Sequence, residues 1–241
     1  MADKNRSKEE VQASLLKTQA ETARVQAEAR KVIAEAESAE VKAEKEKLEL
    51  KKYKEDQKKS KAGDSHNHVY RFSGAVNSTS VIKCRNTLTQ WSRVSPGCDI
   101  EIVFASPGGG ITAGFELFDY IQQLRERGHK ITTGSLGMAA SMAGILLQAG
   151  DQRWIGQQSW ILIHRAAFGA IGKTFEIEDE VELVKRIEER IVKIFTSRSK
   201  LTNLKIKRNW NRKDWWINAD EALEMGLVDE VRGVLAEIED E

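Results

Sequence analysis

The sequence predicts an α/β protein preceded by a long helix, and three observations lead to this prediction. The first 62 of the 241 residues contain no Gly and no Pro and are rich in Ala, Glu and Lys, which are strong helix formers. The stretch AGDSHNH then breaks the helix with Gly63 and other turn formers. From Val69 onward, short apolar runs alternate with amphipathic stretches, as in a largely parallel sheet whose strands are joined by helices. We therefore expect a helical extension over 1–62, a linker over 63–68 and a compact domain over 69–241.

Composition and charge argue against several classes of protein. The net charge is +1, so no overall field favours nucleic acid or a membrane surface. No run of about 18 apolar residues is present, and the N-terminal segment lacks the apolar core of a signal peptide. Cys84 and Cys98 are too few for a disulfide framework, and their spacing matches no zinc site. We expect a cytoplasmic protein that needs neither a metal nor an organic cofactor.

The N-terminal helix carries a weak coiled-coil pattern. Ser7 followed by Glu10 fits a capping box, which predicts that the helix starts at Ser7. From Val11 to Tyr53, apolar and small residues recur at alternating spacings of four and three, which is heptad spacing. Thr, Ala and Glu fill many of these positions, so an isolated helix of this kind would fray. We expect a coiled-coil partner through residues 8–55; a solvated, charged helix without a partner is the alternative.

The first half of the domain is predicted to hold two strands and two helices. VYRFSGAV, beginning at Val69, predicts a strand and a turn, and residues 78–93 have the apolar spacing of a helix. DIEIVFAS, residues 99–106, predicts a buried strand. An amphipathic helix follows over 111–128 and ends with Gly128 as its C-cap.

The second half continues the alternation of strands and helices. HKITTGSLG predicts a strand, ASMAGILLQAG a short apolar helix, and SWILIH over 159–164 another strand. A long amphipathic helix is predicted over 174–200. The stretch 217–231 holds a short helix, stopped by Gly226, and a last strand.

Two of these strands end in features that suit acyl transfer, and α/β sheets place their ligands at strand ends. ASPGGG follows a buried strand, and its glycines Gly108, Gly109 and Gly110 leave backbone N–H groups free to face a substrate. The spacing matches neither a Walker A loop nor a dinucleotide fingerprint, so a carbonyl oxyanion is the better ligand. His164 ends the strand SWILIH and becomes a general base if it reaches a nucleophile.

The third feature is Ser141 in GMAASMAG, at the start of a predicted helix. The free N–H groups of a helix start, including that of Met142, favour developing negative charge. A serine between small residues is also a common structural feature of tight turns. Together with His164 and a pair of backbone donors, it forms an acyl-transfer constellation.

Several motifs together resemble the Clp protease proteolytic subunit family, ClpP. In chain order they are SPGG with ITAGFELFDYI, GMAASMAG, LLQAG, ILIH and NADEALEMGLVDEV, and the match covers about residues 69–231. The resemblance implies the ClpP/crotonase fold of repeated ββα units and the activity of a serine endopeptidase. It also implies polypeptide substrates, assembly into a homo-oligomeric ring, and an ATP-dependent unfoldase as partner.

The same resemblance implies a role for each site. Ser141 is the nucleophile and His164 is the base. The oxyanion lies between the backbone N–H groups of Gly109 and Met142, and the peptide lies beside the Gly-rich segment 108–110.

The sequence departs from the family pattern in three places. The family follows its histidine with Gln-Pro, whereas this chain has Arg165 and Ala166. The acidic stretch that supplies the third triad residue reads RNWNRKDWW, so Asp214 is the preferred third residue and Asn209 the alternative. The N-terminal loops that meet the unfoldase are replaced by the helical segment, which puts that docking in doubt.

Three alternatives to a triad-based protease follow from these departures. The domain could be a catalytically weak or inactive ClpP-like assembly or scaffold protein. A crotonase-type acyl-CoA enzyme would use the same backbone donors but would leave Ser141 and His164 without a role. A Ser–Lys dyad is a variant in which Lys173, the nearest lysine after His164, serves as the base.

Overall fold

The computed structural model describes residues 2–234, with side chains described from Glu10 onward. It divides into two compact units, residues 1–62 and 63–241, and each unit is described by itself.

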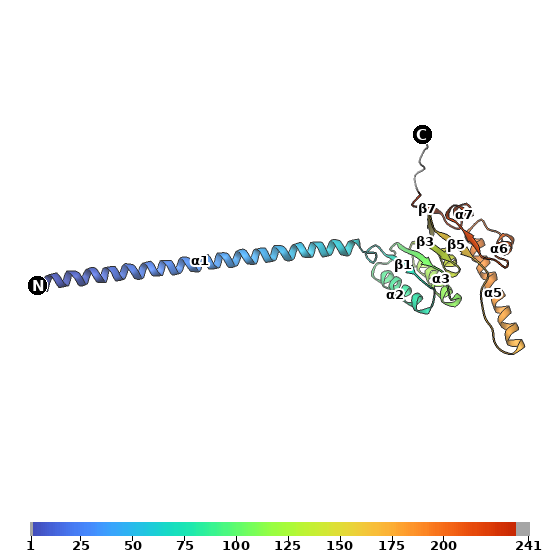
Figure 1. The fold of residues 1–241 in the computed structure, drawn as a ribbon, viewed down its shortest axis with the longest axis horizontal. Helices are drawn as coiled ribbons and strands as arrows, with labels where there is room; N and C mark the ends of the chain where they lie inside the picture. Colours follow the sequence, from blue (N-terminus) through green and yellow to red (C-terminus); the bar gives the residue numbers. More distant parts are fainter. Residues whose placement is uncertain (1, 235–241) are drawn as a thin grey trace, which may run out of the picture. The chain divides into compact units, whose positions relative to one another are not determined.

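The first unit is one unbroken helix, α1 (Ala2–Ala62), as Figure 1 shows. It begins at Ala2, so the prediction of a start at Ser7 is wrong. The residues before Ser7 include no Gly or Pro, so nothing stops the helix from extending through the serine. Every described side chain of α1, from Glu10 to Ala62, is exposed.

The second unit is built on a seven-stranded sheet in the order β1-β2-β3-β4-β7, with β5 paired to β3 and β6 paired to β5. All pairs are parallel except β5 with β6. The strands are β1 (Val69–Ser73), β2 (Ile100–Ser106), β3 (Ile131–Ala140), β4 (Gln152–Gly156), β5 (Trp160–Ile163), β6 (Trp215–Ile217) and β7 (Glu230–Arg232). The predicted α/β class with a long N-terminal helix is confirmed.

Strand β3 is the strand at which the sheet divides. Its residues 132–135 pair with β4, whereas residues 138–140 pair with β5. Gly137 lies between the two segments with a φ of +75°, a conformation that L side chains rarely adopt. Its N–H donates to Ser159 Oγ at 2.8 Å, which ties the bend to the start of β5. The bend therefore carries the end of β3 out of the β4 register and onto β5.

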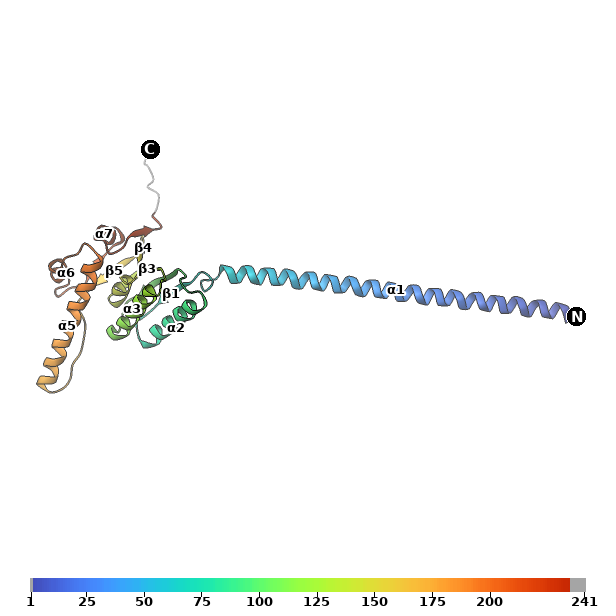
Figure 2. The ribbon, with the colours of Figure 1, turned by 180° about the vertical axis from the view of Figure 1, so that it is seen from behind.

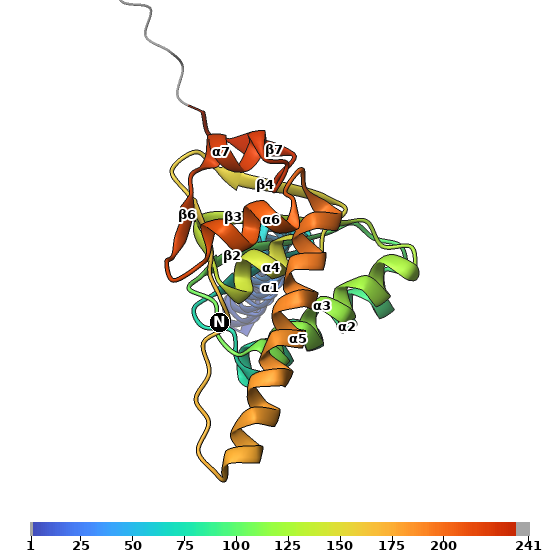
Figure 3. The same ribbon diagram turned by 90° about the vertical axis from the view of Figure 1, so that its right-hand side faces the viewer.

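The helices α2 to α7 accompany the sheet, as Figure 2 and Figure 3 show from two further sides. Figure 3 also shows the N-terminal half of α5 extending away from the sheet, beside the segment that leads into it. The helices are α2 (Ser78–Val94), α3 (Ile111–Glu126), α4 (Met142–Leu147), α5 (Thr174–Arg198), α6 (Asn203–Asn209) and α7 (Ala219–Glu224).

Local sequence signals explain most of these boundaries. Asn77 caps α2 in a reciprocal box with Ser80, and Asn218 caps α7 with Glu221 in the same way. Gly128, with a φ of +90°, follows the end of α3, as the predicted C-cap requires. The core of the second unit contains the fully buried Phe104. Among residues 2–234, no helix is long and apolar enough to span a membrane.

Three elements of the second unit were not predicted: β4, α6 and β6. Each is short, between three and seven residues, and β4 and β6 have their pairing partners far along the chain. Strand β6 consists of WWI, which has no alternation that distinguishes it from a turn.

Candidate active site

Ser141 lies at the junction between β3 and α4, in a backbone conformation that is rare outside glycine. Its φ is +55° and its ψ is −121°, so the chain turns sharply from strand to helix at this residue. Its N–H donates to the carbonyl oxygen of Leu162 at 2.9 Å. Strained, non-glycine residues concentrate at functional sites because the surrounding structure must hold them there.

The register of the sheet places His164 beside this turn. Residues 138–140 of β3 pair with residues 160–162 of β5, so Ser141 comes directly after one strand segment and His164 just after the other. Both strands run in the same direction, so their carboxyl ends open on the same edge of the sheet. Both side chains are half-buried there.

Ser141 and His164 line one pocket with a volume of about 90 Å³. Apolar side chains from three helices form much of its wall, and Gly109 from the Gly-rich segment also lines it. These wall residues, which the sequence analysis did not single out, are Ile111, Ile145, Ile191 and Phe195. The last two lie on one face of α5, where the apolar spacing was the only available signal.

The Gly-rich segment packs directly against the Ser141 turn. A Cβ on Gly108 would lie 2.6 Å from Ser141 Cβ and 2.9 Å from Met142 N. A Cβ on Gly109, where φ is +148°, would lie 2.2 Å from the carbonyl oxygen of Val76. Only glycine fits at these two positions, which explains the sequence motif physically.

Two amide groups at this contact are free to act as donors. Within residues 2–234, the backbone N–H groups of Gly109 and Met142 donate to no protein acceptor. The neighbouring Gly110 N–H, by contrast, donates to Val76 O at 2.7 Å, and Gly108 N–H donates to Ser106 Oγ at 3.1 Å. Unpaired amides beside a pocket are the donors that an oxyanion requires.

The pairing of β5 with β6 ends one residue before His164 and one residue after Asp214, one of the two third-residue candidates. The antiparallel pairs run from Ile161 with Ile217 to Ile163 with Trp215. The positions that would come next in this register are His164 and Asp214. Asn209 instead ends α6, and its side-chain amide donates to the Lys205 carbonyl of its own helix at 2.8 Å.

The hydrogen bonds that would link a serine, a histidine and an acid into a triad are not formed in this structure. Among the described residues, no hydrogen bond joins Ser141 Oγ to His164, and Asp214 is exposed without a bond to the imidazole. In ligand-free active sites such bonds are often long and tighten when substrate binds. Lys173 precedes α5, and its Nζ lies 5.8 Å from the centre of the Phe175 ring; it does not line the pocket.

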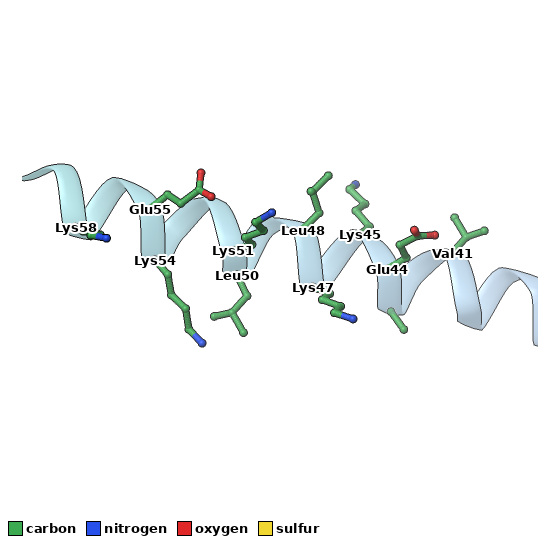
Figure 4. Close-up of a pocket in the computed structure, with 11 residues that line it drawn as sticks. Val41, Glu44, Lys45, Lys47, Leu48, Leu50, Lys51, Lys54, Glu55 and Lys58 are labelled. Carbon is green, nitrogen blue, oxygen red and sulfur yellow. The ribbon is translucent and has the colours of Figure 1, made fainter.

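Other groups in the described part of the chain are weaker candidates for a functional site. Cys84 is buried, and burial raises the pKa of its thiol far above the usual range, so it is a poor nucleophile. Among the side chains described from Glu10 to residue 234, no group of three or more His, Cys, Asp or Glu is arranged to hold a metal ion. A hollow runs along α1 from Val41 to Lys58, and Figure 4 shows that a single helix lines it, which cannot enclose a ligand.

Comparison with known proteins identifies the family of this chain. The sequence model of the family described as Clp protease matches residues 66–234. The ATP-dependent Clp protease proteolytic subunit 2 of Tropheryma whipplei (strain Twist) is 37% identical over 139 residues, which cover 57% of this chain and 75% of that protein. The ATP-dependent Clp protease proteolytic subunit of Porphyromonas gingivalis (strain ATCC BAA-308 / W83) is 34% identical over 138 residues, which cover 56% of this chain and 60% of that protein. The predicted resemblance is therefore confirmed: the chain belongs to the Clp protease family.

Proposed function

We propose that this protein is a serine endopeptidase whose catalytic domain comprises residues 69–241. The observation that carries the proposal is the sheet register, which brings the ends of β3 and β5 together and sets the start of β6 beside the end of β5. Ser141 and His164, from two separate segments, line a pocket that Gly109 also lines, and Asp214 directly precedes β6.

The proposed reaction is acyl transfer in two steps. Ser141 Oγ attacks the carbonyl carbon of the scissile peptide bond while His164 takes the hydroxyl proton. The N–H groups of Gly109 and Met142 donate to the oxyanion that forms. The peptide C–N bond then breaks, the leaving amine receives the proton from His164, and an ester on Ser141 remains. Water, deprotonated by His164, hydrolyses this ester and restores the serine.

Asp214 is proposed to orient His164 and to stabilise its charged form. The carboxylate lies one residue beyond the last pair between β5 and β6, and no described partner competes for it. Bound peptide is proposed to lie extended beside Gly108 and Gly110, because main-chain recognition needs little side-chain bulk.

Reaction with a fluorophosphonate probe tests the nucleophile. The full chain should be labelled once, and Ser141→Ala and His164→Ala should both abolish labelling and the hydrolysis of a fluorogenic peptide. An unlabelled wild-type protein, or labelling that survives in Ser141→Ala, would contradict the proposal. A wild-type protein that is not labelled would favour a non-catalytic assembly or scaffold protein. This is the second candidate function because no described hydrogen bond joins Ser141 to His164.

A matched pair of variants tests the third residue. Asp214→Asn should lower kcat by about four orders of magnitude, the loss seen when a triad carboxylate is replaced. Asn209→Ala removes only an amide bonded to its own helix and should lower kcat less than about twofold. The reverse order of effects would transfer the orienting role to Asn209.

We further propose that the chain assembles as a homo-oligomeric ring. Large apolar side chains are exposed around the N-terminal half of α5, which suits burial against another copy. They are Phe168, Ile171, Phe175, Ile177 and Leu183. An ATP-dependent unfoldase and a coiled-coil partner for residues 8–55 remain proposals, as does a cytoplasmic location, which the free thiols Cys84 and Cys98 would suit.

A further inference from the structure

The segment that follows His164 is held by a single residue of α5. Within residues 164–172, the only described hydrogen bonds are those to Glu188. Arg165 donates from Nε to Glu188 Oε1 and from Nη2 to Oε2, both at 2.9 Å. The Ala166 N–H donates to Oε1 at 3.3 Å. Before His164, in contrast, β5 is held on both sides by β3 and β6.

Charge and burial make this attachment specific to the Arg165 side chain. The Glu188 side chain is only 12% exposed, and a carboxylate so placed is costly unless it is paired and hydrogen-bonded. The planar guanidinium satisfies both oxygens at once, which an ammonium group cannot do. The hydrogen bonds to Glu188, and then its charge, raise the pKa of Arg165, so the guanidinium stays charged.

Glu188 lies on the same face of α5 as two residues that line the candidate active-site pocket. Ile191 and Phe195 lie three and seven residues further along α5, on the same helical face, and both line the pocket with Ser141 and His164. The Arg165–Glu188 pair therefore joins the histidine-bearing segment to the helix that forms the opposite wall. The same pair borders a second hollow with Trp210 and Asn211, on the segment that leads to Asp214.

We propose that Arg165 and Glu188 are positioning residues that fix the His164 backbone relative to Ser141. No described hydrogen bond holds the imidazole itself, so its position depends on the chain on either side of it. The inference rests on the proposed peptidase function, because positioning matters only if His164 acts on Ser141. A shift of about 1 Å in a catalytic group can cost about 100-fold in rate.

The test compares two arginine–carboxylate pairs in the full chain. Arg165→Gln and Glu188→Gln remove the pair beside His164. Arg71→Gln is the matched control, since Arg71 makes a two-bond pair with Asp64 at 2.7 and 3.2 Å and is similarly exposed. It lies on β1, which β2 and β3 separate from β5. Peptide hydrolysis gives kcat and KM, and sedimentation gives the assembly state of each variant.

We expect Arg165→Gln and Glu188→Gln to lower kcat by about 10- to 100-fold with KM changed less than about threefold. Arg71→Gln should leave both constants within twofold of wild type. Arg165→Lys should fall between, and the exchange Arg165→Glu with Glu188→Arg should restore most of the lost kcat. Amide hydrogen exchange over 164–172 should accelerate in Arg165→Gln and not in Arg71→Gln.

Other outcomes overturn the inference, and each has a distinct meaning. Equal kcat values in Arg165→Gln and Arg71→Gln would show that the pair does not position the histidine. A loss of kcat that follows loss of assembly in every variant would show a purely structural role. Unchanged exchange over 164–172 would refute the attachment itself, whatever the activity. A wild-type chain that never reacts at Ser141 would instead refute the peptidase function.

Discussion

Two long, charged helices of this protein, α1 and α5, behave in opposite ways. In α1, every described side chain is exposed, including the apolar residues from Val11 to Tyr53. In α5, Val184, Ile191 and Phe195 are buried on one face, and the last two line the candidate active-site pocket. Helix propensity alone is therefore enough to form a helix. A helix packs into the fold only where one of its faces is apolar and another element covers that face. The α/β unit is stabilised by its own buried core, whereas the described side chains of α1 are all exposed.

The largest expected difference in stability is between a substitution in the core of the α/β unit and one on the surface of α1. Phe104→Ala, at a fully buried position, should lower the free energy of unfolding by about 3–5 kcal/mol because it leaves a cavity. Leu50→Ala on α1 should change it by less than about 0.5 kcal/mol. Urea unfolding followed by tryptophan fluorescence measures this, since all six tryptophans follow residue 62. Equal effects would mean that α1 and the α/β unit unfold together.

A smaller effect should come from the ion pair that links β4 to the residue before β7. Arg153 donates to both oxygens of Asp229, and its side chain is only 7% exposed. Burial would raise the pKa of Asp229, but the hydrogen bonds and charge of Arg153 outweigh it and hold that pKa below its usual range. Asp229→Asn leaves a buried guanidinium without its counter-ion and should lower the free energy of unfolding by about 2 kcal/mol. This is less than for a fully buried pair, because Asp229 is 40% exposed.

The destabilisation caused by Asp229→Asn should decrease as the pH falls. A carboxyl whose pKa is lowered by folding stabilises the protein above its unfolded pKa, about 3.9, and loses that contribution as the pH falls through the folded value. The difference between wild type and Asp229→Asn should therefore be full at pH 7 and shrink below about pH 4. A difference that is constant from pH 7 to pH 3 would show that the charge of Asp229 does not matter.

Removal of a helix cap should cost less again. Asn77→Ala removes the side-chain oxygen that accepts from the Ser80 N–H at 3.0 Å at the start of α2, and should lower the free energy of unfolding by about 1 kcal/mol. Thr79→Ala, two residues later and without a role in the cap, is the control. If both variants unfold at the wild-type urea concentration, local capping contributes nothing measurable to the α/β unit.

The smallest effect on the α/β unit should come from the seam of α1, and it tests whether α1 has a partner. Val25→Ser with Val32→Ser should leave the tryptophan-monitored midpoint within about 0.5 kcal/mol of wild type. If α1 forms a coiled coil, the same change should lower the helical signal at 222 nm and make it fall further on dilution. A helical signal that ignores both the substitution and the concentration would indicate a solvated helix without a partner.

Local sequence was enough to identify α1, most of the strands and helices, and the residues that carry the proposed chemistry. Helix propensity, apolar periodicity and the glycines around Gly109 act within a few residues, so they can be interpreted without the fold. The family motifs singled out Ser141 and His164 for the same reason. Element starts were less certain, and α1 begins five residues before the predicted start at Ser7.

Only the tertiary structure decided how these local pieces meet. The register that sets Trp215, the neighbour of Asp214, opposite Ile163 at the end of β5 depends on β6, which has no periodic signal of its own. The attachment of Arg165 to Glu188 joins residues 23 positions apart, and no local rule relates an arginine in a loop to one glutamate among many on a helix. Pairing between distant segments depends on the packing of the whole sheet, so it cannot be deduced from either segment alone.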